Sequence, residues 1–103
     1  MLNRATRILN RLQDAPVLLV EPGFVVESRI SHGIHGDEED LAWSVEWRDN
    51  VGCEWTANFS EGALAKATIA GSSVAARDFE GAEVVFRLYR PEKQINLSSP
   101  RTK

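Results

Sequence analysis

The stretch LAWSVEWRDNVGCEWTANFS, residues 41–60, decides the fold, because hydrophobic and polar residues alternate along two segments that flank a polar turn. Alternation with a period of two, rich in aromatic residues, predicts two β-strands. Asp49 and Asn50 between them predict the turn of an antiparallel hairpin. One face of this hairpin, which we call the tryptophan face, carries all three tryptophans of the chain. Its members are Leu41, Trp43, Val45, Trp47, Cys53, Trp55, Ala57 and Phe59.

The tryptophan face forms either part of the core or a platform for a ligand. If it were exposed, its rings would present roughly 600 Å² of apolar surface, at least as much as the largest patch of a typical soluble monomer. Val45 and Ala57 on the same face offer a ligand no polar group. We therefore predict that the face is core, so that Trp47→Ala or Trp55→Ala costs roughly 3–5 kcal/mol and unfolds the domain. Because Cys53 lies on this face, we also predict that it is a buried, inert thiol.

Two segments have the spacing of helices. Residues 3–14 repeat apolar side chains every three or four positions, with Arg4, Arg7 and Arg11 on another face, and Pro16 ends the pattern. This predicts an amphipathic N-terminal helix.

The second segment, EGALAKATIA, covers residues 61–70. Ser60 suits the N-cap position and Gly71 suits the residue after the last turn, so the pattern predicts a short helix between them.

Further strands are expected on both sides of these elements. Pro22 and Gly23 interrupt the β-branched run of residues 17–30 and fit the two central positions of a type II turn, which favours a bend in one long strand over a tight hairpin. The sequence EVVFRLY at residues 83–89 alternates and predicts a strand after a turn at residues 78–81. A helix beginning at Asp78 is the competing interpretation, which the β-branched residues disfavour.

These elements predict an α+β domain over residues 1–90. It has an N-terminal helix, an antiparallel sheet of four or five strands centred on residues 41–59, and one short helix packed on the sheet. Residues 91–103, PEKQINLSSPRTK, predict a flexible basic tail.

A single cysteine, no signal-type segment and no apolar run of membrane length predict a cytoplasmic protein without membrane contact.

Charge is unevenly distributed along the chain. The net charge is −3, yet residues 21–61 carry ten acidic groups against Arg29 and Arg48. Such a segment repels nucleic-acid phosphate and favours a protein partner with a basic surface. Carboxylates that merely keep the outer side of the strands solvated would give the same pattern. The three arginines of the first helix are a weak nucleic-acid footprint.

Residues 31–40, SHGIHGDEED, are compatible with three roles. They could form a solvated connection or an acidic recognition loop. They could also bind metal, because His32 and His35 with four carboxylates could supply ligands to zinc, manganese or nickel. However, Gly33 and Gly36 disfavour a regular helix that would align the histidines, and the spacing matches no known metal-binding pattern. We predict no metal or cofactor and no catalytic residues, because no phosphate-binding loop or nucleophile elbow occurs.

The preferred hypothesis is a non-enzymatic interaction protein that docks on a basic surface of a larger protein. In size and charge the chain is similar to immunity proteins and to inhibitors encoded by phages or other mobile elements, although no motif supports the likeness. The residues expected to bind the partner are Asp37, Glu38, Glu39, Asp40, Glu46 and Glu54. Two competing hypotheses are a metal-binding domain or metal-dependent enzyme at His32 and His35, and a small-ligand binder with a pocket between sheet and helix. An edge strand offers a route to a homodimer.

Overall fold

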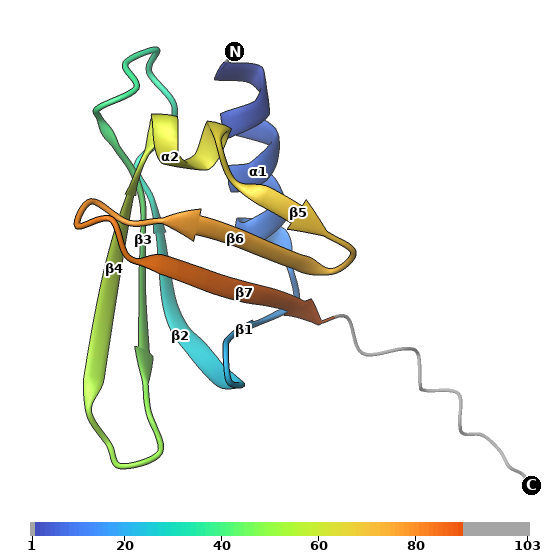
Figure 1. Ribbon diagram of the computed structural model, residues 1–103, viewed down its shortest axis with the longest axis vertical. Helices are drawn as coiled ribbons and strands as arrows, with labels where there is room; N and C mark the ends of the chain where they lie inside the picture. Colours follow the sequence, from blue (N-terminus) through green and yellow to red (C-terminus); the bar gives the residue numbers. More distant parts are fainter. Residues whose placement is uncertain (1, 90–103) are drawn as a thin grey trace, which may run out of the picture.

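The computed structural model describes residues 2–89 as an α+β fold in which an antiparallel sheet curls into a half-barrel around the first helix (Figure 1). The predicted fold class and the N-terminal helix are confirmed, but the sheet has seven strands where four or five were expected. The strand order is β4-β3-β2-β1-β7-β6-β5. In chain order the elements are α1 Leu2–Asp14, β1 Val17–Val20, β2 Phe24–Ser31, β3 Leu41–Arg48, β4 Glu54–Ser60, α2 Glu61–Ala65, β5 Thr68–Ala70, β6 Ser73–Arg77 and β7 Glu83–Tyr89.

Two of the additional strands are β5, which replaces the end of the helix predicted for residues 61–70, and β6, which follows it. The N-cap is confirmed, because Ser60 Oγ accepts a hydrogen bond of 3.1 Å from the Ala63 N–H. The helix nevertheless ends at Ala65, and β5 pairs with β6. Gly71, with φ +62°, lies in the turn between these strands and does not cap the helix. Helix propensity is a weak preference that pairing at a sheet edge overrides here.

Another strand appears because the chain reverses at Pro22 and Gly23. The Gly23 N–H donates to the Val20 carbonyl at 2.7 Å, and Leu19 lies opposite Val25, so β1 and β2 form a tight hairpin. The predicted bend in one long strand is therefore wrong. The proline occupies the third position of the turn and the glycine the fourth, one place later than a type II turn would have them.

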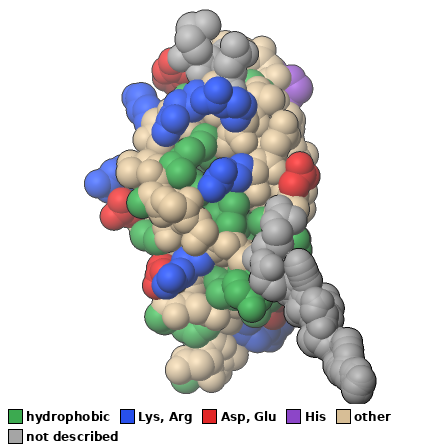
Figure 2. All heavy atoms as spheres, turned by 90° about the vertical axis from the view of Figure 1, so that its right-hand side faces the viewer, with side chains coloured by type: hydrophobic (Ala, Val, Ile, Leu, Met, Phe, Trp, Pro, Cys, Tyr) green, Lys and Arg blue, Asp and Glu red, His purple; other side chains and the backbone are tan. Residues whose placement is uncertain are grey.

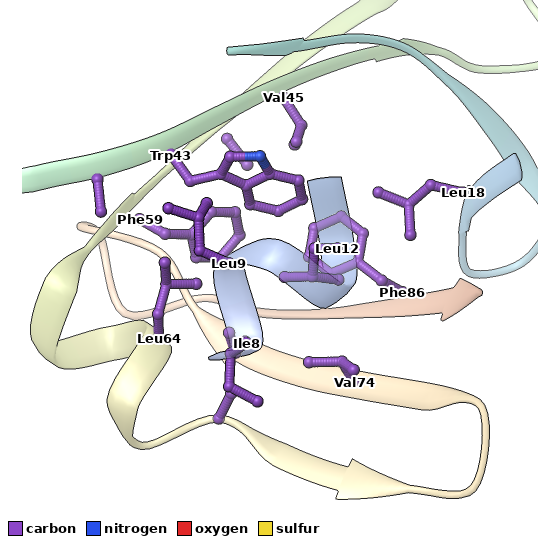
Figure 3. Close-up of a cluster of buried hydrophobic side chains, with 14 of the residues drawn as sticks. Ile8, Leu9, Leu12, Leu18, Trp43, Val45, Phe59, Leu64, Val74 and Phe86 are labelled. Atoms are coloured by element: carbon purple, nitrogen blue, oxygen red, sulfur yellow. The ribbon is translucent and has the colours of Figure 1, made fainter. Parts of the chain in front are cut away.

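The core lies between α1 and the concave face of the half-barrel (Figure 3). Trp43, Phe59 and Phe86 are fully buried, with ring centroids 5.3–5.8 Å apart. The helix contributes Ile8 and Leu12 to the same cluster. Tilted and edge-to-face rings at these separations add to the stabilisation from area burial.

Polar contacts fix the end of α1 against the sheet. The Trp43 Nε1–H donates to Gln13 Oε1 at 2.7 Å. Arg29 Nη1 donates to the carbonyls of Leu12 and Ala15 at 2.8 Å and of Gln13 at 3.1 Å. Since the last carbonyls of a helix have no partner within it, Arg29 caps the C-terminus of α1 and compensates its partial negative charge.

The open side of the half-barrel is bridged at one point. The predicted turn at residues 78–81 is confirmed, and the strand that follows it is β7, so the competing helix is wrong. The Phe79 N–H in this turn donates to the Asn58 carbonyl of β4 at 3.1 Å. The tip of the β6–β7 hairpin therefore reaches the strand at the far end of the sheet.

Neither helix in the described part of the chain has the length and apolarity needed to cross a bilayer. The tail predicted for residues 91–103 lies outside the described residues.

Candidate functional site

The acidic loop, residues 37–40, connects β2 to β3 at one end of the half-barrel (Figure 1). All four of its residues are exposed. Among residues 2–89, none of the ion pairs involves one of its carboxylates. The loop thus presents four neighbouring carboxylates to solvent.

A buried carboxylate that the sequence pattern did not reveal holds this loop in place. Glu61, the first residue of α2, is fully buried. Its side chain accepts backbone N–H bonds from His35 at 2.6 Å, Gly36 at 3.0 Å and Asp37 at 3.1 Å. Hydrogen bonds to an ionised acceptor are stronger than bonds between neutral groups, and three of them satisfy a carboxylate that would otherwise be costly to bury.

The backbone also packs the acidic loop on the first turn of α2. The Glu61 N–H donates to the Asp40 carbonyl and the Gly62 N–H to the Glu38 carbonyl, both at 2.9 Å. A Cβ on Gly62 would lie 3.1 Å from the Cβ and carbonyl oxygen of Glu38, so glycine permits the close approach. Within the loop, Asp37 Oδ1 accepts the Glu39 N–H at 3.0 Å. The loop is therefore ordered although its side chains are exposed.

The two histidines beside the loop bond to separate protein groups. His32 Nε2 lies 3.2 Å from Ser44 Oγ, and His35 Nε2 lies 2.9 Å from the His32 carbonyl oxygen. Within residues 2–89, no three His, Cys, Asp or Glu side chains converge in the manner of a metal site.

The remaining acidic residues predicted to bind a partner are not gathered at the loop. Glu46 is exposed midway along β3, opposite Thr56. Glu54 begins β4, lies opposite Arg48 and forms an ion pair with it at 3.0 Å. At the rise of an extended strand, this pair lies roughly 25 Å from the acidic loop. The six predicted residues therefore form one compact group of four and two separate positions along the hairpin.

The tryptophan face is core over only half of its length. Trp43, Val45, Ala57 and Phe59 are buried as predicted. Towards the tip of the hairpin, however, Trp47 is half-buried and Trp55 is 51% exposed. The hairpin tip projects beyond the rest of the half-barrel, so the described chain covers this end only in part (Figure 1).

Two other residues of the tryptophan face also differ from expectation. Cys53 is exposed, so the prediction of a buried thiol is wrong for the same reason. Leu41 is exposed and Ala42 is buried in its place, because the pairing of β3 with β4 shifts register between Leu41 and Trp43.

A groove of about 560 Å³ opens between α1 and the end of β7. Figure 2 views the molecule from the side of the β5–β6 turn, where hydrophobic side chains lie among basic ones. The lining residues are Arg7, Asn10, Arg11, Asp14, Ala15, Pro16, Ser72, Leu88 and Tyr89.

The three arginines of α1 differ in what they contact. Arg4 donates to the carbonyls of Ala65 and Ala67, and Arg11 donates to the Gly71 carbonyl at 3.1 Å. Two of the three arginines therefore connect α1 to the segment that runs from the end of α2 to the β5–β6 turn, and they are not free to bind a phosphate backbone.

Comparison with known proteins gives no relative from which to transfer a function. No family model, no curated protein and no solved structure matches this chain. Three features of the described residues remain as candidates for function: the acidic loop, the exposed end of the tryptophan face and the groove beside α1.

Proposed function

We propose that this protein is a non-enzymatic interaction protein that docks on a basic surface of a larger protein through its acidic loop. The observation that supports this proposal is the buried Glu61 carboxylate, which bonds three backbone N–H groups of residues 35–37. A loop that only keeps a connection solvated has no need of such an anchor. Ordering before binding lowers the entropic cost of association, so an anchored acidic loop suits recognition.

The charge of the loop suits the early steps of docking. Four exposed carboxylates within four residues produce a local negative field that steers a basic surface towards the loop. Glu46 adds a separate exposed carboxylate midway along β3. Glu54 adds less, because Arg48 compensates its charge. We propose residues 37–40 as the primary contact, with Glu46 and Glu54 at its margin.

Small inhibitors and immunity proteins act by occupying the surface of a larger protein, and we propose the same mode for this chain. We place it in a reducing compartment such as the cytoplasm, because Cys53 is an exposed single thiol that oxidation would couple to other molecules.

The test is capture of partners from lysate on immobilised protein, washed at low and at high salt. The Glu38→Gln/Glu39→Gln variant removes two charges but leaves the turn bond of Asp37 intact. The matched control, Glu80→Gln/Glu83→Gln, removes two exposed charges from the β6–β7 hairpin. We expect the loop variant to associate with the captured partner roughly tenfold more slowly and with a weaker salt dependence. Equal rates for both variants would refute the role of the loop.

The groove beside α1 favours a second candidate function, binding of a small ligand. Its volume of about 560 Å³ lies within the range of ligand pockets. Arg7 and Tyr89 would suit an anionic compound with an aromatic ring. A thermal screen of such compounds tests this, because a ligand that binds only the folded state raises the melting temperature. Stabilisation that survives in an Arg7→Gln/Tyr89→Ala variant would place the ligand elsewhere.

A further inference from the structure

The exposed end of the tryptophan face borders a hollow at the end of the molecule opposite the acidic loop. The hollow has a volume of about 280 Å³ and lies between the β1–β2 turn and the tip of the β3–β4 hairpin. It is lined by Glu21, Phe24, Trp47, Asp49, Asn50 and Trp55. Three aromatic rings, two carboxylates and one amide thus surround it, and none of the lining residues is a cation.

The two indoles at this hollow are held in fixed positions. Trp47 and Trp55 lie opposite each other in the β3–β4 ladder, and their rings are nearly parallel, with centroids 6.4 Å apart and planes inclined by 9°. The Trp55 Nε1–H donates to Asp49 Oδ2 at 3.0 Å. Because the Trp55 ring is already stacked and its N–H already hydrogen-bonded, it loses little conformational entropy when a partner binds. Tryptophans fixed in this way are common among the residues that contribute most to binding energy.

Asp49 gives the hollow a fixed negative charge. Its Oδ1 accepts the Val51 and Cys53 N–H groups at 3.0 and 2.9 Å, while Oδ2 accepts the indole N–H. The Trp55 hydrogen bond, together with these backbone bonds, holds the pKa of Asp49 below its ordinary value of 3.8 against the opposing effect of desolvation. The second carboxylate, Glu21, already pairs with Arg87 at 3.0 Å. Of the two carboxylates at the hollow, Asp49 is therefore the one that no ion pair compensates among the described residues.

We propose that this hollow binds a guanidinium group, supplied by an arginine side chain of the protein partner. A cation is attracted to the faces of indole rings, and nearby carboxylates strengthen that attraction. A guanidinium is also planar and weakly hydrated, so it stacks on a flat ring while its edges donate hydrogen bonds. Glu21 and the Asn50 side-chain oxygen offer acceptors at the rim. A lysine ammonium fits less well, because it is strongly hydrated and cannot stack.

This inference rests on the proposed function only for the source of the arginine. The hollow and the acidic loop lie at opposite ends of the same hairpin, so one basic partner surface could contact both. Binding of the guanidinium group itself can be tested without the partner, so a failure of the loop proposal and a failure of this one are distinguishable.

The test is NMR titration of the full chain with N-acetyl-arginine amide, observing the three indole N–H signals. The neutral isostere N-acetyl-citrulline amide and N-acetyl-lysine amide serve as matched probes. We expect the arginine probe to shift the Trp47 and Trp55 signals, while the signal of Trp43, which bonds Gln13 in the core, stays in place. The citrulline probe should bind roughly 2- to 30-fold more weakly, since this is the change in affinity that cation–π attraction supplies.

Variants separate the hollow from the rest of the surface. Trp55→Ala should weaken arginine binding by the same roughly 2- to 30-fold, and an unchanged Trp43 signal will show that it remains folded. Val51→Ala is the matched control, because Val51 is 78% exposed at the same hairpin tip but does not line the hollow. Stationary Trp47 and Trp55 signals, or equal binding of citrulline, would overturn the proposal. Equal binding of the lysine probe would overturn the choice of guanidinium.

Discussion

Glu61→Ala is the most informative single substitution, because it removes the anchor of the acidic loop without altering the acidic loop itself. The change deletes three hydrogen bonds and leaves the N–H groups of residues 35–37 without their acceptor. Bonds to a charged group contribute roughly 1.5–3 kcal/mol each. Truncation also removes the cost of burying a carboxylate, and water can reach N–H groups in a loop. We therefore expect a loss of roughly 2–4 kcal/mol, a large part of the roughly 5–15 kcal/mol that stabilises a typical domain.

Glu61→Gln is a milder substitution at the same residue. Its side-chain oxygen can keep the bonds from Gly36 and Asp37, while its NH₂ group would face the His35 N–H. One bond of three is lost, so we expect a loss of roughly 1–2 kcal/mol.

Urea unfolding measures the free energy of both variants, and amide hydrogen exchange reports the loop directly. The amides of residues 35–37 should exchange faster in Glu61→Ala than in a Glu80→Ala control, which changes an exposed carboxylate in a turn. A loss below about 1 kcal/mol with unchanged exchange at these amides would refute the claim that Glu61 orders the loop. Partner binding should weaken in Glu61→Ala even though residues 37–40 keep every charge.

Three further predictions address the core, the hairpin tip and the helix cap. Trp43→Ala should cost roughly 3–5 kcal/mol in urea unfolding. Trp55→Ala should cost no more than about half as much, because this residue is 51% exposed, and similar losses for both variants would show that the tip is buried in solution. Because the pKa of Asp49 is depressed in the folded state, its contribution to stability is present above pH 3.8 and disappears as the pH falls through the lower, folded-state pKa. The NMR signal of the Trp55 indole N–H should therefore shift with a midpoint below pH 3.8. A midpoint above pH 3.8 would contradict the hydrogen bond between Trp55 and Asp49. Arg29→Met should destabilise the protein by roughly 1–3 kcal/mol, because it leaves two carbonyls of the last turn of α1 and the Ala15 carbonyl after it without their donor. A melting temperature equal to that of the unsubstituted protein would argue against the cap.

The sequence predicted on which face of the hairpin each side chain lies, but it could not predict how deeply each side chain of that face is buried. Alternation places Trp43 and Trp55 on one face whatever covers that face. Only the position of α1 and of the crossing strands determines that Trp43 is buried while Trp55, near the tip of the hairpin, is 51% exposed. The prediction that the tryptophan face is buried, because it is too large an apolar patch to be exposed, was therefore correct for its inner half and wrong for its other residues.

The missing strands and the missing anchor have local explanations. Residues 68–70 are too few to be told apart by periodicity from the end of a helix, and they directly follow the alanine-rich segment 63–67. Glu61 is an ordinary acidic residue for the first turn of a helix, where it suits the helix dipole. No local signal shows that its carboxylate turns towards a loop more than twenty positions earlier, so tertiary structure alone identifies it. The four loop carboxylates, in contrast, were recognisable as a group from the sequence.

The hydrogen bond between the Phe79 N–H and the Asn58 carbonyl has a consequence for behaviour at high concentration. A half-barrel, unlike a closed barrel, leaves two strand edges where another molecule could add a strand and begin aggregation. Here the β4 edge is interrupted at Asn58, and the β5 edge is only three residues long. The β5 edge is therefore too short to template a growing sheet, and the β6–β7 hairpin obstructs strand addition along β4. We expect concentrated samples to remain free of fibrils until the β6–β7 hairpin detaches from β4.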